Sequence, residues 1–262
     1  MICGERKRKI VIDLTEDDDK IPSENTSLEK ISFESQLAEI RKRRKADFQC
    51  ERQKAEKSKP VAFVLAPGSG NGMAGITPIC ASLGCRVERL KKWAGIEYKH
   101  METNMQMITK LAESCLDSNI VFVGYSYGCR VIARLLASRP DLARCALFIS
   151  YPLFDPVPPN RAHNGMFRAD ELASVPSHVT LRLMSGASDH FLATHWQPLP
   201  QGPDALRMTM KRTKATSSLH VLPDTGHCIH FDSDSRAIRP LLSSLDELRK
   251  VAAASPGLLS PP

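Results

Sequence analysis

Three side chains that could together activate a serine hydroxyl follow one another along this chain: Ser126, Asp189 and His227. A serine hydroxyl is a weak nucleophile near neutral pH, so it needs a base within hydrogen-bond distance, and a histidine base needs a third group that holds its tautomer. Each of these residues comes shortly after an apolar run of β type. If those runs are parallel strands, the three side chains meet at one edge of a sheet, where ligands bind in doubly wound folds. The predicted chemistry is attack of Ser126 on an acyl carbonyl, with His227 as base and Asp189 as its orienting group.

The serine lies in the pentapeptide Gly124-Tyr125-Ser126-Tyr127-Gly128, between the apolar run 120–124 and a helix-compatible segment, 127–138. The pattern G-x-S-x-G between a strand and a helix is typical of a nucleophile elbow, a sharp turn that lifts the serine Oγ above the sheet. The turn strains the serine backbone and packs it against neighbouring segments, so the flanking glycines are expected for steric reasons.

Acyl transfer also requires donors for the oxyanion of the tetrahedral intermediate. In an elbow of this kind, one donor is the N–H of the residue after the nucleophile and the other comes from an early strand-to-helix loop. These positions predict the backbone N–H groups of Tyr127 and of Ser69, which lies in the loop Pro67-Gly68-Ser69-Gly70-Asn71-Gly72.

Other assignments of these residues stay open. Asp224 is an alternative acid and His230 an alternative base, both close to His227 in sequence. Cys228 and the His227-x-x-His230 spacing could suggest a metal, but no third ligand of matching context is present in the sequence, so we predict no metal and no cofactor.

The glycine-rich loop has a nucleotide-binding alternative. A strand, a Gly-x-Gly loop starting at Gly68, and Glu88 twenty residues later resemble a dinucleotide-binding fingerprint. The third glycine of that fingerprint would fall at Met73, and the alternative leaves the elbow, Asp189 and His227 unexplained. We therefore favour the oxyanion role for the loop.

The order of elements predicts the fold class. Short β-type runs alternate with helical segments, which indicates an α/β protein with a mostly parallel, doubly wound sheet and helices on both faces. The expected strands are 61–66, 85–90, 120–124, 145–151, 179–184 and 218–222, and the expected helices are 73–83, 98–116, 127–138, 203–215 and 234–253. We expect a charged tail at 1–59, a catalytic domain at 60–253 and a Pro-rich end at 254–262, with segment 152–178 forming a short lid over the site.

Composition narrows the class of protein. The chain has 262 residues, of which 42% are hydrophobic, and its eight cysteines form no C-x-x-C pair, which is typical of a reducing compartment. No apolar stretch approaches the length of a membrane span.

The net charge of +7 comes largely from basic clusters at 6–9 and 41–45, without interleaved aromatic residues, so we do not expect a nucleic-acid partner. These clusters could act as nuclear import signals, and we expect a location in the nucleus, the cytoplasm or both.

Several segments resemble one family. The runs VLAPGSGNGM (64–73), VGYSYGCRVIA (123–133), FISYPL (148–153), MSGASD (184–189) and DTGH (224–227) are similar to the α/β-hydrolase domain of the dienelactone-hydrolase-like group that includes testis-expressed protein 30 and subunit 3 of the non-specific-lethal complex. The resemblance covers about residues 60–250. It implies an α/β-hydrolase fold and a triad at Ser126, Asp189 and His227. Family members often have His-Gly in the oxyanion loop where this chain has Pro67-Gly68, and some are regarded as complex subunits more than as enzymes.

The tail contains a second recognisable pattern. Residues 9–19, KIVIDLTEDDD, combine an apolar core of Ile10, Val11, Ile12 and Leu14 with an acidic run, as in SUMO-interacting motifs. Such a segment can add as a strand to an exposed sheet edge on its partner. Two functions are therefore predicted: a serine hydrolase acting on an ester, thioester or related acyl bond, and, as the alternative, a catalytically silent hydrolase-fold module of a nuclear, chromatin-associated complex that recruits SUMO-modified partners.

Overall fold

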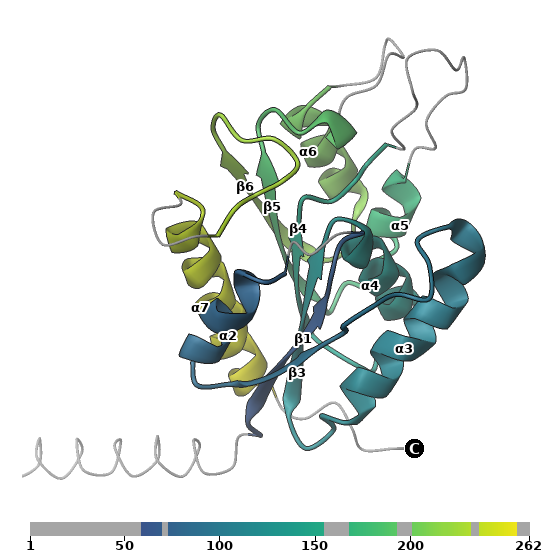
Figure 1. The fold of residues 1–262 in the computed structure, drawn as a ribbon, viewed down its shortest axis with the longest axis vertical. Helices are drawn as coiled ribbons and strands as arrows, with labels where there is room; N and C mark the ends of the chain where they lie inside the picture. Colours follow the sequence, from purple (N-terminus) through teal and green to yellow (C-terminus); the bar gives the residue numbers. More distant parts are fainter. Residues whose placement is uncertain (1–58, 70–72, 155–167, 193–200, 232–235, 256–262) are drawn as a thin grey trace, which may run out of the picture. The chain divides into compact units, whose positions relative to one another are not determined.

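The computed structural model describes residues 59–69, 73–154, 168–192, 201–231 and 236–255 (Figure 1). The expected tail with its SUMO-interacting pattern and basic clusters lies outside these residues except for Lys59, as does the Pro-rich end beyond Ser255. The described residues include the whole predicted triad and both predicted oxyanion donors.

The centre of the fold is a sheet of six strands in the order β2-β1-β3-β4-β5-β6, with every neighbouring pair parallel. The strands are β1 (Val61–Ala66), β2 (Arg86–Arg89), β3 (Asn119–Tyr125), β4 (Cys145–Ile149), β5 (Thr180–Gly186) and β6 (Thr216–Leu222). Parallel strands present all their carboxyl ends at one edge, which is where the loops after β1, β3, β5 and β6 come together.

Helices cover both faces of this sheet (Figure 1). The helices are α2 (Ile76–Ser82), α3 (Met101–Glu113), α4 (Tyr127–Ser138), α5 (Ala169–Ala173), α6 (Pro203–Arg212) and α7 (Ile238–Ala254), with short 3-10 turns at Tyr98–His100 and His190–Leu192. Buried side chains of α2 and α7 pack on one face, and those of α3, α4, α5 and α6 pack on the other. The predicted fold class, an α/β protein with a parallel sheet between two helical layers, is confirmed.

The strand sequences explain why both faces are covered. In β1 every residue is buried; Phe63 and Leu65 point to the α2/α7 side, whereas Val64 points to the α3/α4 side. Because alternate side chains of a strand point to opposite faces, a continuous apolar run can be buried only between two layers.

The predicted elements agree with the structure most closely where the apolar pattern is strongest. The strand at 61–66 and the helix at 127–138 have the bounds predicted for them. The predicted helix at 98–116 is a 3-10 turn followed by α3, and β6 begins at Thr216, two residues earlier than expected. The strand begins with the polar residues Thr-Ser-Ser, so the apolar pattern does not predict where it starts.

Both described ends of segment 152–178, the predicted lid, pack in the core of the domain. Leu153 and Phe154 are buried after β4, and the segment ends in α5, whose Ala169 and Leu172 are also buried in the core. These apolar residues at the two ends therefore stabilise the domain. The residues between them, 155–167, lie outside the described part of the chain.

Four of the six cysteines that the structure describes are buried in the core. Cys80, Cys115, Cys129 and Cys145 are buried free thiols. Burial raises the pKa of Cys80 and of Cys145 to about 12, so both stay protonated and pack as small apolar side chains.

Among the described helices, none combines the length and the apolar composition that a membrane span needs.

A buried ion-pair cluster joins α5 to α4. Arg130 donates to both carboxylate oxygens of Glu171 at 2.8 Å, and Arg134 donates to the same carboxylate at 2.9 Å. Burial alone would raise the pKa of Glu171, but the hydrogen bonds and charges of the two arginines outweigh it and lower the pKa below its usual value. The short helix α5 is thus fixed by charge as well as by packing.

Replacing Glu171 by Gln should lower the free energy of unfolding by about 3 kcal/mol near neutral pH, because Arg130 would be left as a buried, uncompensated charge. The lowered pKa of Glu171 means that its stabilisation is present above the unfolded-state pKa and is lost as the pH falls through the folded-state pKa. Urea unfolding of wild type and variant should therefore differ less at acidic pH than at pH 7. The half-exposed Glu247, which pairs with Arg182, provides the control: Glu247→Gln should cost less than about 1 kcal/mol. Equal losses in the two variants would contradict the buried-pair account.

Candidate functional site

Ser126 occupies a strained turn between β3, which ends at Tyr125, and α4, which begins at Tyr127. Its backbone has φ 49° and ψ −116°, in the positive-φ region that non-glycine residues rarely adopt. Its N–H donates to the carbonyl of Ile149 at 2.8 Å, which fixes the turn on β4. Such a conformation costs about 1–3 kcal/mol and persists only where surrounding structure enforces it.

The glycines of the pentapeptide are required by close backbone contacts. A Cβ added to Gly124 would lie 2.7 Å from Cys129 Cα, and one added to Gly128 would lie 2.1 Å from the carbonyl oxygen of Ala66. Both separations are far inside van der Waals contact. The start of α4 therefore packs directly on β1 and β3, which is the steric reason predicted for these two glycines.

The side chains of Ser126, His227 and Asp189 form a continuous hydrogen-bonded chain. Ser126 Oγ lies 2.7 Å from His227 Nε2, and His227 Nδ1 lies 3.0 Å and 2.9 Å from the two carboxylate oxygens of Asp189. A carboxylate only accepts, so the Nδ1 proton is assigned to the bond with Asp189. Nε2 is then the unprotonated nitrogen and can accept the serine proton.

The loops after β5 and β6 hold Asp189 and His227 at this separation. Ser188 N–H donates to Thr225 O at 2.9 Å, which continues the β5–β6 pairing beyond the strands. A Cβ on Gly186 would lie 2.1 Å from the same Thr225 carbonyl oxygen, so only glycine allows the two loops to approach this closely. Asp189 is fixed further by the N–H of Phe191, which donates to its Oδ1 at 2.9 Å.

Two hydroxyl groups hold the backbone of His227. Tyr125 Oη donates to His227 O at 3.1 Å and accepts from Ile229 N–H at 2.9 Å, and Ser150 Oγ donates to His227 O at 2.8 Å. Burial raises the pKa of the Tyr125 phenol, which keeps it protonated as a donor. Sequence analysis missed both positioning residues. Their one local signal is that each stands at the end of a strand, Tyr125 in β3 and Ser150 directly after β4.

Aromatic side chains pack on the histidine. The Phe191 ring centroid lies 4.1 Å from that of His227, and the His190 ring lies 5.6 Å from it on the same turn. Both Asp189 and His227 are buried, with exposed fractions of 2% and 8%. This shielding strengthens the interaction between the carboxylate and an imidazolium, because little water competes for either group.

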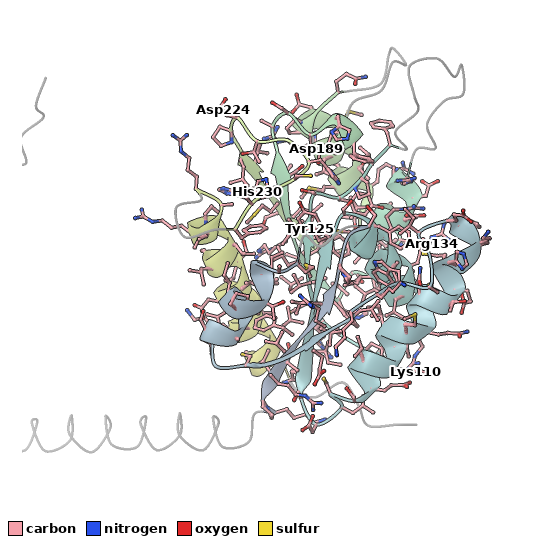
Figure 2. All side chains as sticks on the ribbon, in the orientation of Figure 1. Lys110, Tyr125, Arg134, Asp189, Asp224 and His230 are labelled. Carbon is pink, nitrogen blue, oxygen red and sulfur yellow. The ribbon has the colours of Figure 1, made fainter. Side chains whose placement is uncertain are left out.

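The alternative acid and base do not occupy these positions. Asp224 is exposed and has a positive φ of 51° in the turn after β6, and Figure 2 shows it at the outer end of that turn. His230 is also exposed, at the rim of the same cleft as Ser126. Among the described residues, no group of three or more His, Cys, Asp or Glu side chains could hold a metal ion.

The loop after β1 packs against the elbow. A Cβ on Gly68 would lie 3.3 Å from Ser126 Cβ, so the loop backbone lies directly beside the serine. The buried indole of Trp93 donates to Pro67 O at 3.0 Å and to Gly68 O at 3.2 Å. In a trans peptide the N–H points opposite to the C=O, so the N–H of Ser69 faces away from Trp93.

The other predicted donor, the N–H of Tyr127, lies in the first turn of α4, where N–H groups have no carbonyl partner within the helix. Its side chain is fixed on the far side: Asn104 Nδ2 donates to Tyr127 Oη at 2.9 Å, and the ring packs edge-on against Trp93 with centroids 5.4 Å apart. One network of buried side chains therefore supports both predicted donor segments.

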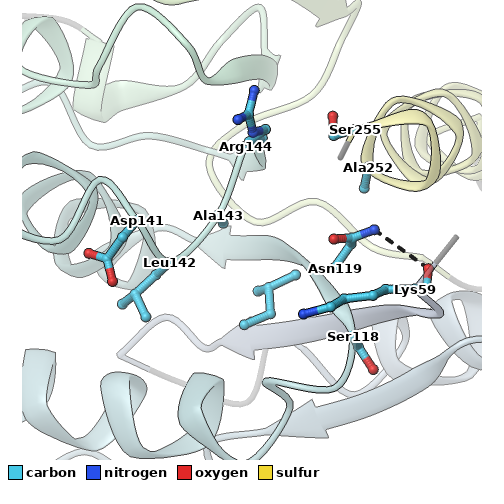
Figure 3. A pocket seen from close by; sticks show the side chains of 10 residues that line it. Lys59, Ser118, Asn119, Asp141, Leu142, Ala143, Arg144, Ala252 and Ser255 are labelled. Carbon is cyan, nitrogen blue, oxygen red and sulfur yellow. Dashed lines mark hydrogen bonds between the residues drawn. The ribbon is translucent and has the colours of Figure 1, made fainter. Parts of the chain in front are cut away.

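A cleft of about 490 Å³ opens over these groups. Its lining includes Gly68, Ser69, Ser126, His227 and His230. A smaller hollow of about 30 Å³ lies at the opposite edge of the sheet, where Asn119 donates to the carbonyl of Lys59 (Figure 3). That hollow holds about one water molecule. The cleft at Ser126 is the place where a substrate could reach the serine.

No family model and no curated protein matches this sequence. Solved structures do match. Alpha/beta hydrolase domain-containing protein 10 from mouse has a TM-score of 0.53 and 13% identity, over 74% of this chain and 92% of that one. One of the metagenome-derived lipolytic enzymes LipS and LipT has a TM-score of 0.55 and 13% identity, over 74% and 95%. Est1E from Butyrivibrio proteoclasticus, with ferulic acid bound, has a TM-score of 0.52 and 13% identity, over 75% and 90%. The chain therefore has the α/β-hydrolase fold.

Replacing Tyr125 by Phe should lower the free energy of unfolding by about 2 kcal/mol, because it leaves the buried N–H of Ile229 without its acceptor and removes one donor to His227 O. Urea unfolding monitored by circular dichroism measures the loss. Tyr98→Phe is the matched control, since that ring is 64% exposed and its hydroxyl makes only a long 3.4 Å contact with Arg134. Equal, small effects of the two substitutions would show that the Tyr125 hydroxyl does not hold the His227 loop.

Proposed function

We propose that this protein is a serine hydrolase that cleaves an ester, thioester or related acyl bond through an acyl-enzyme on Ser126. The observation that carries the proposal is the hydrogen-bonded chain from Ser126 Oγ through the His227 ring to the Asp189 carboxylate. The fold of the solved structures is compatible with this chemistry, although fold alone does not determine it.

In the first half of the reaction, Ser126 Oγ attacks the carbonyl carbon while its proton moves to His227 Nε2. The imidazolium that forms is stabilised by the Asp189 carboxylate at 2.9 Å, which itself remains ionised. His227 then gives the proton to the leaving alcohol or thiol as the tetrahedral intermediate breaks down. The acyl group remains on Ser126 as an ester.

In the second half, water enters the cleft left by the leaving group, and His227 Nε2 takes a proton from it. The resulting hydroxide attacks the acyl-enzyme carbonyl, and collapse of the second intermediate returns the proton to Ser126 Oγ. The acid product leaves and the starting state is restored. No cofactor takes part in either half.

The negative charge of each intermediate is assigned to the backbone N–H groups of Ser69 and Tyr127. The Trp93 bond to Gly68 O turns the Ser69 N–H away from Trp93, and the first turn of α4 adds the positive end of a helix dipole. Donors of this kind contribute about 3 kcal/mol or more each when they are fixed before the reaction. Pro67 in place of the family's His leaves these backbone groups unchanged.

A fluorophosphonate probe tests the proposal directly. We expect wild-type protein to acquire one probe per chain, with peptide mapping placing it on Ser126, and we expect labelling of Ser126→Ala to fall to background because no other activated nucleophile is proposed. Ser114→Ala, on the exposed end of α3, is the control and should label like wild type. Folded wild-type protein that remains unlabelled would favour the catalytically silent interaction module.

We further propose that the tail binds SUMO or a SUMO-modified protein, and that the protein acts in the nucleus or the cytoplasm. The supporting observation is the sequence KIVIDLTEDDD, with an apolar core that suits a strand added to a sheet edge and an acidic run that suits basic residues beside it. This binding does not require Ser126, so it applies equally to an enzyme and to a scaffold.

Immobilised SUMO should retain the full-length chain, and replacing Ile10, Ile12 and Leu14 together by Ala should weaken retention about tenfold or more, because these residues are the proposed apolar anchors. Leu28→Ala with Ile31→Ala, also in the tail, is the control and should bind like wild type. Retention that is unaffected by the triple substitution would show that another surface is responsible.

A further inference from the structure

A second cavity lies beside the cleft at Ser126, on the β2 side of the sheet. It has a volume of about 660 Å³, within the range of small-molecule sites, and it shares Gly68, Ser69 and Ala74 with the Ser126 cleft. The two hollows therefore meet at the loop that carries the proposed Ser69 donor. A ligand lying in both would pass directly over this loop.

The second cavity is lined by three cations, Arg89, Lys91 and Lys92. All three are exposed, and none of them forms an ion pair with another residue in the described part of the chain. Among the described residues that line the cavity, none is Asp or Glu. The neighbouring carboxylate of Glu88 is paired with Arg86. This cavity, termed the basic groove, thus has an uncompensated positive charge.

Strand register gives the distance from this charge to the serine. Leu65 of β1 is level with Arg89 of β2 on one side and with Val123 of β3 on the other. Neighbouring strands are about 4.8 Å apart, so Arg89 and Val123 are separated by about 10 Å across the sheet. The basic groove begins where β2 ends, and Ser126 follows where β3 ends. A bound anion would therefore lie about 10 Å to the side of the reacting carbonyl.

Apolar side chains line the path between these two points. Three buried side chains line the basic groove, those of Met73, Leu90 and Trp93. Ile96, which is 52% exposed, lines it as well. Trp93 is also the residue that bonds the carbonyls of Pro67 and Gly68. A ligand in the groove would contact the same side chain that holds the oxyanion loop.

We propose that the basic groove binds an anionic group of the acyl substrate, a phosphate or a carboxylate, which a short apolar linker separates from the reacting carbonyl. This inference rests on the proposed hydrolase function and specifies its substrate class. The anion is recognised by Arg89, Lys91 and Lys92, and the linker by the apolar wall. Anion binding in the groove places the carbonyl of such a substrate over Ser126.

Two pairs of esters test this substrate class. In one pair the anion is in the acyl part: the mono-para-nitrophenyl ester of suberic acid and its neutral methyl ester. In the other it is in the alcohol part: the butyryl ester of hexanediol monophosphate and neutral hexyl butyrate. We expect wild type to favour the anionic member of at least one pair in kcat/KM, and Lys91→Gln with Lys92→Gln to reduce that preference about fivefold, as expected for two exposed charge contacts. Which pair shows the preference tells whether the groove takes a carboxylate in the acyl part or a phosphate in the alcohol part.

The matched control is Lys110→Gln with Lys214→Gln, which removes the same charge from exposed sites on the later part of α3 and before β6, toward the opposite edge of the sheet. Its preference should equal that of wild type. High salt should reduce the wild-type preference as well, because exposed charges are screened. Equal hydrolysis of anionic and neutral esters, or a preference that the Lys91/Lys92 variant keeps in full, would overturn the proposal while leaving the hydrolase function intact.

Ligand binding to a variant without the Ser126 hydroxyl tests the basic groove independently of the hydrolase reaction. The chain has two tryptophans, Trp93 and Trp196, so Ser126→Ala with Trp196→Phe leaves Trp93 as the only indole reporter. Hexyl phosphate should change its fluorescence saturably, whereas hexanol should not, and adding Lys91→Gln with Lys92→Gln should weaken the response about fivefold. Circular dichroism establishes that each variant is folded. A response that is the same for both ligands, or that does not depend on the lysines, would refute the groove even if Ser126 proved reactive.

Discussion

The hydrogen bond between Ser126 Oγ and His227 Nε2 is the interaction on which the rest of this site depends, because it joins segments 101 residues apart in the chain. It forms only if β3 and β6 end at the same edge of the sheet and the loop after β6 turns back toward β3. The hydroxyl groups of Tyr125 and Ser150 donate hydrogen bonds to the His227 carbonyl and hold its backbone. Asp189 fixes the ring through its Nδ1. The site is therefore a consequence of parallel topology together with a few buried hydroxyl groups.

The turn that places Ser126 at the cleft carries a conformational cost. Its φ of 49° is unfavourable for a residue with a side chain, and the energy comes from the packing of α4 against β1 and β3. Gly124 and Gly128 permit that packing, and the Ser126 N–H bond to Ile149 O completes it. This cost has a functional advantage under the proposed mechanism, since a nucleophile held rigidly needs little reorganisation in the transition state.

The sequence predicted the fold class, the β1 and α4 bounds and the residues that meet at the sheet edge, because these depend on local patterns: apolar runs, a strand–Ser–helix turn, and the order of loop residues. It did not predict Tyr125 and Ser150 as positioning residues, since their partner, the His227 carbonyl, is fixed only by tertiary packing. The packing of the ends of segment 152–178 was likewise not predicted. A Pro-rich, partly apolar segment suggests a loop, and nothing local shows that Phe154 and Leu172 complete the core. The basic groove likewise arises only when the ends of β1 and β2 lie side by side.

The most direct test of the central claim is the rapid release of para-nitrophenol when the enzyme meets para-nitrophenyl butyrate, followed by mapping of the acid-quenched protein. If Ser126 Oγ attacks the carbonyl and the acyl-enzyme then hydrolyses more slowly, the first turnover gives a burst of one equivalent of para-nitrophenol per chain, and the butyryl group is found on the peptide that contains Ser126. Hydrolysis that the Ser126→Ala variant retains in full, or no hydrolysis by folded protein, would contradict the account.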